Sequence, residues 1–143
     1  MGQGEHVDPA DLATRARAAG NDEATLIVEG VGGLLAPLAD DYTVRDLAIS
    51  LRLPLLIAAR PGLGTINHTL LTLQTARAGG LDVRAVVLTP WPAQPSEMEL
   101  SNRDTIAQMG DIEVAALGHV RSPAPADLAR AGDALPWRDW LRD

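Results

Sequence analysis

The chain has 143 residues, of which 46% are hydrophobic and 22% charged, which fits one globular domain with a core. Cysteine is absent, which excludes disulfides, thiolate metal sites and cysteine nucleophiles and is typical of a reducing cytoplasm, the expected location. The net charge is −7 and all 12 basic residues are arginines, so neither a basic groove for nucleic acid nor a lysine-dependent mechanism is expected. No leader is evident, and no apolar run approaches the roughly 18 residues that a membrane span needs.

Apolar periodicity and turn signals predict an alternation of helices and strands from the amino terminus onward. An alanine-rich helix is expected over Pro9–Ala19, because proline suits a first helical turn and a nearby aspartate can cap the exposed amides. A buried strand is expected over residues 25–28, ending on Glu29 and a glycine-rich turn. Thr43 is placed to cap a helix over Val44–Leu51, whose apolar residues recur on one face.

The second half continues this alternation. Its expected elements are a strand over Leu55–Ala59, a glycine loop at 60–64, a helix over 66–78, a strand over 83–89, a proline-rich irregular loop at 90–95, a helix over 97–109, a strand over 113–117 and a helix over 137–141. Together they predict a single α/β domain over residues 1–143, with a parallel sheet flanked by helices. Strands 25–28 and Leu55–Ala59 are expected to be central, apolar and covered on both faces.

Two glycine loops follow successive strands of this predicted sheet. In parallel sheets ligands bind outside the carboxyl ends of the strands, so both loops are expected to open on one site. At the first loop, Glu29 could hold a magnesium ion while the amides of Gly30, Val31 and Gly32 receive phosphate oxygens. Alternatively, Glu29 is a solvated strand end and the glycines only make a turn.

The second loop leads into a helix through Gly64, Thr65, Ile66 and Asn67. Glycine lets the backbone approach a ligand, and free amides at a helix start suit a carboxylate or a phosphate. Thr65 could equally be an ordinary N-cap. His68 fits a structural, hydrogen-bonding role better than that of a base or metal ligand.

Two further groups of residues could contact a ligand. Trp91, in the predicted proline loop, could stack on a nucleotide base or cover the sheet, as large aromatic residues more commonly do. The Ser101-Asn102-Arg103 triplet could bind a ligand or another subunit, or form a polar helix face.

The chain resembles dethiobiotin synthetase. The similar segments are VEGVGGLL at residues 28–35, TVRDLA at 43–48, LP at 53–54 and above all GLGTINHTLLT at 62–72. The WP pair at 91–92 and the SNR triplet at 101–103 are similar to an actinobacterial-looking branch of the family. The resemblance covers residues 25–118. It implies a homodimer of P-loop NTPase-like, three-layer subunits that uses ATP and Mg²⁺ to carboxylate 7,8-diaminononanoate and close its ureido ring in biotin synthesis.

The same resemblance assigns roles to single residues. Glu29 matches an acidic magnesium ligand, and Glu29, Gly30, Val31 and Gly32 match a nucleotide-phosphate loop. Gly64, Thr65, Ile66 and Asn67 match the segment that receives the substrate carboxylate from the neighbouring subunit. Thr89 and Pro90 stand where many members place an asparagine-led pair that reads the base, so the co-substrate could be another nucleoside triphosphate. Residues 121–123 match a further nucleotide contact weakly.

Family members begin with a glycine-rich phosphate loop that carries lysine, and nothing before Thr25 matches it. The chain is therefore expected to be the carboxy-terminal part of such a fold, with one sheet face or edge uncovered and no catalysis of its own. Truncation, a misplaced start and natural loss remain open explanations. Two other functions fit parts of the sequence: a non-catalytic binding or dimerisation module, and a related amidating synthetase of cobalamin synthesis, whose pattern lacks the asparagine-histidine pair.

Overall fold

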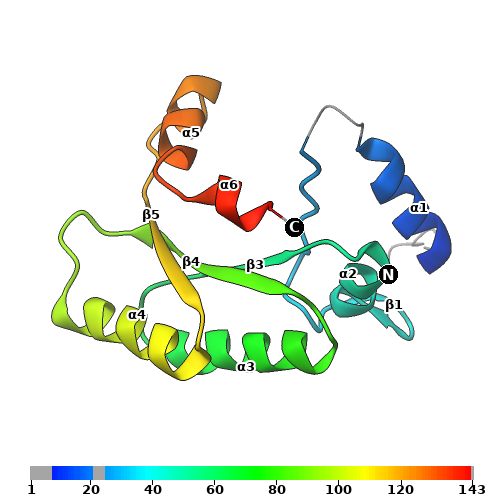
Figure 1. Cartoon of the computed structure of the whole chain (residues 1–143), viewed down its shortest axis with the longest axis horizontal. Helices are drawn as coiled ribbons and strands as arrows, with labels where there is room; N and C mark the ends of the chain where they lie inside the picture. Colours follow the sequence, from blue (N-terminus) through cyan, green and yellow to red (C-terminus); the bar gives the residue numbers. More distant parts are fainter. Residues whose placement is uncertain (1–7, 21–24, 143) are drawn as a thin grey trace, which may run out of the picture.

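The computed structural model describes residues 8–20 and 25–142 and shows an α/β fold (Figure 1). Its elements are α1 (Pro9–Ala19), β1 (Pro37–Ala39), β2 (Tyr42–Thr43), α2 (Val44–Leu51), β3 (Leu55–Ala59), α3 (Thr65–Ala78), β4 (Val83–Trp91), α4 (Glu97–Gly110), β5 (Glu113–Gly118), α5 (Pro125–Gly132) and α6 (Trp137–Trp140). The predicted parallel sheet is confirmed: β3, β4 and β5 pair in that order, all parallel. Within the described residues, no helix is both long and apolar enough to cross a lipid bilayer.

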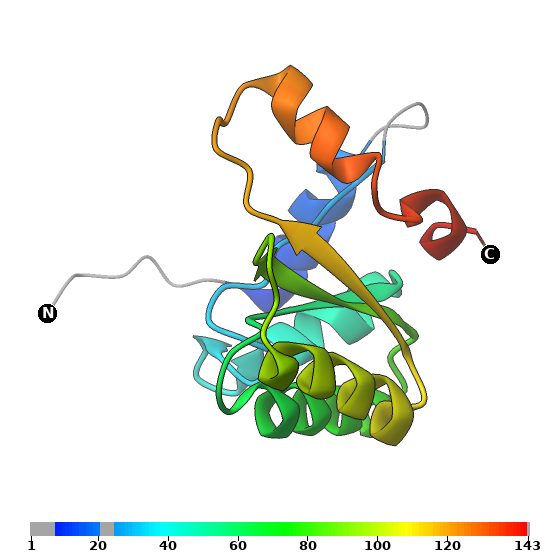
Figure 2. The same ribbon diagram turned by 90° about the vertical axis from the view of Figure 1, so that its left-hand side faces the viewer.

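Helices α3 and α4 cover one face of this sheet, as Figures 1 and 2 show. The core between sheet and helices contains Ile57, Leu73, Val86, Leu88 and Ile106, all of them buried. Residues alternate in direction along a strand, so Val86 and Leu88 face these helices while their neighbours in β4 face the other way. This packing fixes the ends of β3 and β4 and the start of α3 relative to one another.

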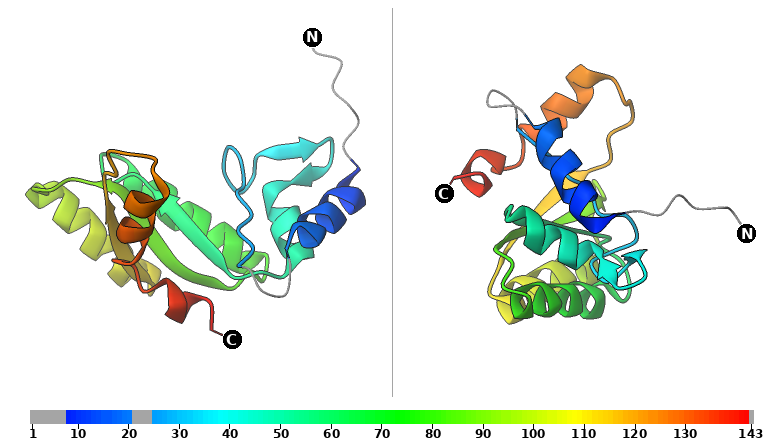
Figure 3. Two further views of the ribbon diagram at one scale, coloured as in Figure 1. Left: turned by 90° about the horizontal axis from the view of Figure 1, so that it is seen from above. Right: turned by 90° about the vertical axis from the view of Figure 1, so that its right-hand side faces the viewer.

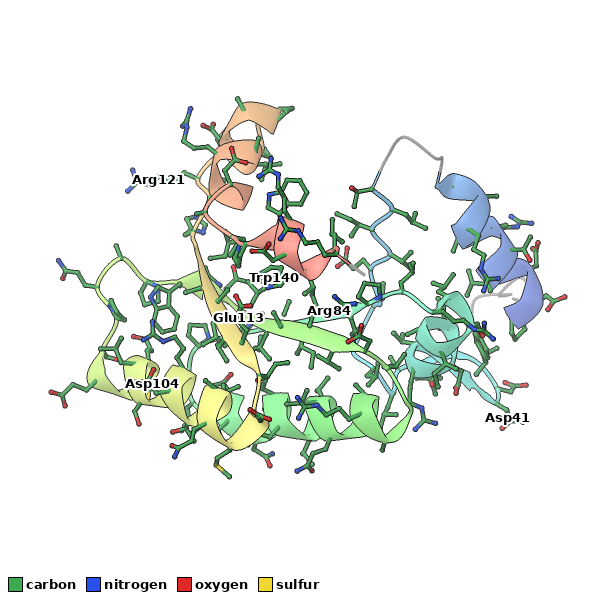
Figure 4. The ribbon with its side chains drawn as sticks, in the orientation of Figure 1. Asp41, Arg84, Asp104, Glu113, Arg121 and Trp140 are labelled. Carbon is green, nitrogen blue, oxygen red and sulfur yellow. The ribbon has the colours of Figure 1, made fainter. Side chains whose placement is uncertain are left out.

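The opposite face of the sheet is covered in part by the carboxy-terminal segment (Figure 4). Trp140 of α6 is buried against Ala85 and Val87 of β4. Its indole N–H donates to the Glu113 carboxylate at 3.1 Å. On the same face Leu56 of β3 stays 44% exposed, so this third layer does not extend over β3. This agrees with the expectation that one face of the sheet would lack cover.

A second cluster of elements lies beside the end of the sheet where α3 finishes (Figure 3). There α1 packs on α2 through the buried residues Ala13, Leu47 and Leu51. The start of α2 is fixed by a capping box, in which the Thr43 hydroxyl accepts from the Asp46 amide while the Asp46 carboxylate accepts from the Thr43 amide. The predicted helices over Pro9–Ala19 and Val44–Leu51 are both confirmed.

The strand predicted over residues 25–28 is wrong, because these residues form no strand. Ile27 is 84% exposed and Val28 38% exposed, so the apolar side chains of this segment are not in the core. A strand needs a hydrogen-bonding partner, and residues 25–28 pair with no strand of the described sheet, including the free edge of β3. It follows that β4 is the central strand and β3 an edge strand, covered on one face, contrary to the expectation of a central β3 covered on both.

Three smaller differences concern prolines and short elements. The predicted loop at 90–95 starts later, because β4 continues to Trp91, which pairs with Gly118. The ladder is irregular between Leu88 and Trp91, which accommodates a proline without a backbone N–H. Helix α5 was not predicted, although its Pro125 suits a first helical turn. The β1–β2 hairpin was not predicted either, since its strands have only three and two residues.

Candidate functional site

The candidate site lies at the carboxyl edge of the sheet, where β3 passes through a glycine loop into α3. Pro61 is buried, whereas the next apolar side chain, Leu63, is 96% exposed. Gly64 is the N-cap of α3 and has φ of 87°, a left-handed conformation that glycine adopts without strain. It provides no side-chain hydrogen bond to the helix, and the Thr65 amide donates to the Gly62 carbonyl at 3.2 Å, so the amides of Ile66 and Asn67 are the ones left to other partners.

The side chain of Thr65 belongs to the core rather than to this open loop. It is 6% exposed, and its hydroxyl lies 3.4 Å from the hydroxyl of Thr69, one turn later in α3. The alternative interpretation of Thr65 as the N-cap is therefore wrong, because Gly64 occupies that position. A ligand at this loop would meet the backbone of Thr65.

The next polar residues of α3 face outward. Asn67 and His68 are both exposed, and the His68 amide donates to the Gly64 carbonyl at 3.1 Å. The imidazole lies against the loop, since its Cδ2 is 3.5 Å from where a Cβ on Gly64 would stand. The loop, the helix start and two polar side chains thus form one open surface.

Helix α4 holds the glycine loop in place through Asn102. This half-buried side chain donates from Nδ2 to the carbonyls of Pro61 at 3.0 Å and Gly62 at 3.5 Å. The sequence pattern indicates that Asn102 contacts a ligand or another subunit, or belongs to a polar helix face. It does not reveal this hydrogen bond to the glycine loop. An asparagine within a helix was the available signal, because asparagine is a poor helix former that needs another reason to be there.

The side chain of Trp91 favours the interpretation that it covers the sheet. It is half-buried and packs against the core beneath β4, and the Arg103 guanidinium lies 5.8 Å from its ring centre. Thr89 and Pro90, joined by a cis peptide bond, precede it at the end of β4. The structure therefore brings Thr89 and Pro90 to the same sheet edge as Gly64, because parallel strands end together.

The first glycine loop lies elsewhere, so the prediction that both loops open on one site is wrong for this structure. A Cβ on Gly30 would stand 2.4 Å from Val44 Cγ1, which shows how closely the loop approaches the start of α2. Leu34, just after the loop, packs with Ala76 and Leu81 near the end of α3. The 14 residues of α3 are about 21 Å long, so the two glycine loops lie near opposite ends of that helix.

Glu29 does not form a magnesium site with the residues around it in this structure. Its side chain is exposed, and within the described residues no group of three or more His, Asp or Glu side chains could hold a metal ion. Mg²⁺ in nucleotide sites takes one or two carboxylates together with phosphate oxygens and water. Glu29 could give one such oxygen, but the described residues do not gather three such side chains around it.

An apolar groove runs along the outer surfaces of α3 and α4, next to the glycine loop. Its volume is about 510 Å³, and it is lined by Leu63, Gly64, Ile66, Asn67, Leu70, Leu71, Gln74, Asn102 and Met109. Leu71 is 54% exposed and Met109 68% exposed. Asn67 therefore stands where the candidate site and the groove meet.

Comparisons with known proteins agree with these features. The AAA domain family model matches residues 2–124. The ATP-dependent dethiobiotin synthetase BioD of Mycobacterium sp. (strain KMS) is 39% identical over 132 residues, which cover 92% of this chain and 58% of that protein. The proteins of the same name from Mycolicibacterium gilvum (strain PYR-GCK) and Anaeromyxobacter dehalogenans (strain 2CP-C) are 40% and 38% identical, with 64% and 58% of their lengths covered. The chain thus spans about three fifths of these relatives.

Proposed function

We propose, from the premise that this chain belongs to the AAA domain family, that it is the carboxy-terminal part of an ATP-dependent dethiobiotin synthetase. Homology to enzymes of that name supports the proposal. The complete protein would carboxylate 7,8-diaminononanoate and close its ureido ring, with ATP as co-substrate and Mg²⁺ as cofactor. The observation that carries this proposal is the open glycine loop at the sheet edge, where Gly64 leaves the first amides of α3 without a side-chain cap.

In this proposal the loop receives the carboxylate tail of the substrate. The amides of Ile66 and Asn67 stand at the positive end of the α3 dipole, which favours a negative group, while the Thr65 amide donates to the Gly62 carbonyl. Because Thr65 is buried, specificity there would come from the backbone and from the exposed Asn67 side chain. Thr89 and Pro90, at the neighbouring strand end, would border the nucleotide base.

The proposed roles of Glu29, Gly30, Val31 and Gly32 require a change in their surroundings. These residues would provide one magnesium ligand and the phosphate loop only if residues 25–28 joined the sheet and carried the loop to the carboxyl edge. When Mg²⁺ is bound with a nucleotide, it neutralises charge on the phosphates. Within the described residues Glu29 belongs to no group of three side chains that could hold a metal ion, so its present surroundings do not fit Mg²⁺.

We propose that the 143-residue chain does not catalyse ring closure. Phosphoryl transfer depends on positioning and on charge stabilisation, in which the lysine of a phosphate loop has a large part. The chain contains no lysine. Arginine, with its planar guanidinium, does not replace a compact ammonium at such a site.

We also propose that two copies of the chain associate through the groove between α3 and α4. Its exposed residues Leu63, Leu71 and Met109 form an apolar surface next to Asn67, so a partner there would stand beside the bound carboxylate. This surface equally supports the second candidate function, a non-catalytic dimerisation and binding module. Turnover by a complete enzyme that contains this chain would favour the synthetase, whereas binding without turnover would favour the module.

The test is binding of 7,8-diaminononanoate to the purified chain, measured by calorimetry. Asn67→Asp places a carboxylate beside the proposed carboxylate site, and charge repulsion should weaken binding about tenfold. The same change favours the helix, since acidic residues stabilise helix starts, so weaker binding could not come from unfolding. Gln108→Glu on α4 is the matched control, because it adds the same charge on an exposed side chain outside the groove.

Equal affinities for the Asn67→Asp and Gln108→Glu variants would contradict the proposed substrate site. Activity is measured separately, with the unaltered chain, diaminononanoate, bicarbonate, Mg²⁺ and ATP. Turnover above background would contradict the proposal that this chain is inactive alone.

A further inference from the structure

The two halves of helix α4 are held in different ways. The second half is fixed in the core, because Ile106 is buried and a Cβ on Gly110 would stand only 2.9 Å from a side-chain carbon of α3. Arg77 of α3 adds to this by donating to the carbonyls of Gly110 at 2.7 Å and Asp111 at 3.1 Å. The first half, residues 97–103, consists of half-buried and exposed residues. Its position therefore depends on side-chain contacts more than on core packing.

Two consecutive side chains in this first half contact the ends of different strands. Asn102 donates to the carbonyls of Pro61 at 3.0 Å and Gly62 at 3.5 Å, in the loop that follows β3. Arg103 places its guanidinium 5.8 Å from the ring centre of Trp91, the last residue of β4. Consecutive residues of a helix point about 100° apart, so a single turn reaches both strand ends.

These two strand ends carry the two parts of the candidate site. The loop after β3 leads into the start of α3, and its Gly62 carbonyl accepts from Asn102 at 3.5 Å and from the Thr65 amide at 3.2 Å. The end of β4 carries residues 89–90 directly before Trp91. Under the proposed function the first segment receives the carboxylate of the substrate, and the second borders the base of the nucleotide.

We propose that the first half of α4 couples these two parts of the site, with Asn102 and Arg103 as its positioning residues. Because this half rests on side-chain contacts at both strand ends, a shift at one contact moves the helix and so changes the other contact. A ligand at the glycine loop would alter the surroundings of Trp91, and a ligand beside Trp91 would affect the loop by the same free energy. The identity of the two ligands rests on the proposed function, whereas the coupling between the strand ends does not.

Such coupling suits a reaction that joins two substrates. The reacting groups must be placed relative to one another, and an error of about 1 Å can cost about 100-fold in rate. Under the proposed function the diamine and the nucleotide would each adjust the part of the site that holds the other. The two halves of the site would then reach their final positions only when both substrates are bound.

The experiment labels the purified 143-residue chain with 5-fluorotryptophan and follows its three tryptophans by fluorine NMR. Trp91→Phe assigns the signal of Trp91. Asn102→Ala should shift or broaden that signal, although Asn102 itself contacts the other strand end. The signals of Trp137 and Trp140 should stay in place, because these two residues pack with β4 on the opposite face of the sheet. They show whether a variant has loosened the whole domain.

The reverse direction is measured by hydrogen exchange of the amides at residues 62–64. Arg103→Gln removes the cation from the Trp91 ring and should speed this exchange about threefold, the size expected for the loss of an exposed cation–π contact. Arg103→Lys keeps a cation beside the ring and should restore most of the original exchange rate. The controls are Asp104→Asn, which breaks the exposed ion pair with Arg103 at 3.2 Å, and Ser101→Ala, which removes an exposed hydroxyl. Both should leave the exchange and the Trp91 signal unchanged.

An unchanged Trp91 signal in Asn102→Ala would overturn the proposal, as would unchanged exchange at residues 62–64 in Arg103→Gln. Exchange in Arg103→Lys as fast as in Arg103→Gln, or equal effects of the control variants, would also overturn it. Movement of all three tryptophan signals would show general loosening instead of coupling and would have the same consequence.

A final measurement adds diaminononanoate at a saturating concentration, with calorimetry to establish whether it binds. Binding should shift the Trp91 signal of the unaltered chain, and binding without that shift would contradict the coupling. Absence of binding would contradict the proposed substrate site, and the coupling would then be decided by the measurements without ligand.

Discussion

Asn102→Ala should loosen the glycine loop without unfolding the protein. The Asn102 side chain connects α4 to the carbonyls of Pro61 and Gly62, some 40 residues away. The bond at 3.0 Å has good geometry and is worth about 1 kcal/mol, while the contact at 3.5 Å is at the limit and adds little. A loss of about 1 kcal/mol corresponds to about a fivefold rise in local opening.

The assay is hydrogen exchange, read at the amides of Gly62, Leu63 and Gly64. These should exchange about fivefold faster in the variant, while amides of β4 keep their rates because the core around Val86 is untouched. Ser101→Ala is the matched control, since its side chain is exposed on the same helix. Equal loop exchange in the Asn102 and Ser101 variants, or faster exchange throughout the sheet, would refute the idea that Asn102 acts as a local clamp.

Three further predictions concern the caps, the sheet cover and the first loop. Thr43→Ala removes the N-cap of α2 and should cost about 1 kcal/mol in urea denaturation. Hydrogen bonds from the Thr43 hydroxyl and the Thr43 amide lower the pKa of Asp46, so their stabilisation is present above the ordinary carboxylate range and is lost as the pH falls through the lowered pKa. The variant keeps the amide, so its acid dependence should shrink without vanishing, and an unchanged dependence would contradict the assignment. Trp140→Phe keeps a ring over β4 but loses the bond to Glu113, at a cost of about 1 kcal/mol, whereas Trp140→Ala should cost about 3 to 5 kcal/mol in thermal unfolding; equal losses would show that packing is unimportant there. In a complete enzyme Glu29→Gln should lower turnover and raise the Mg²⁺ requirement, and an unchanged magnesium titration would remove Glu29 from the site.

Helices whose start and end depend on neighbouring residues could be predicted closely from the sequence. For α2, Thr43 and Asp46 form a capping box and Leu47 and Leu51 lie on one apolar face, so all the necessary information lies within nine residues. The strand at Leu55–Ala59 was also predicted with its correct bounds, since a short apolar run between turn signals is informative by itself.

Residues 25–28 show what a local sequence pattern cannot predict. Their sequence, TLIV, is as apolar as that of β3, yet Ile27 is 84% exposed and the segment is unpaired. Strand propensity describes how well a residue suits a pleated, half-buried surface, and another segment must provide that surface. The link between Asn102 and Pro61 was hidden for the same reason, because partners 41 residues apart meet only after the sheet has formed.

The separation of the two glycine loops bears directly on the proposed chemistry. Around Gly64 the geometry comes from a helix start whose position is fixed by the core and by Asn102, so the structure already holds the backbone that the proposed carboxylate site needs. Around Glu29 the required geometry depends on a strand that does not form, so the acidic residue stays exposed near the opposite end of α3. The proposed role of Glu29 therefore depends on strand pairing, because only a strand at residues 25–28 that joined the parallel sheet would end at its carboxyl edge.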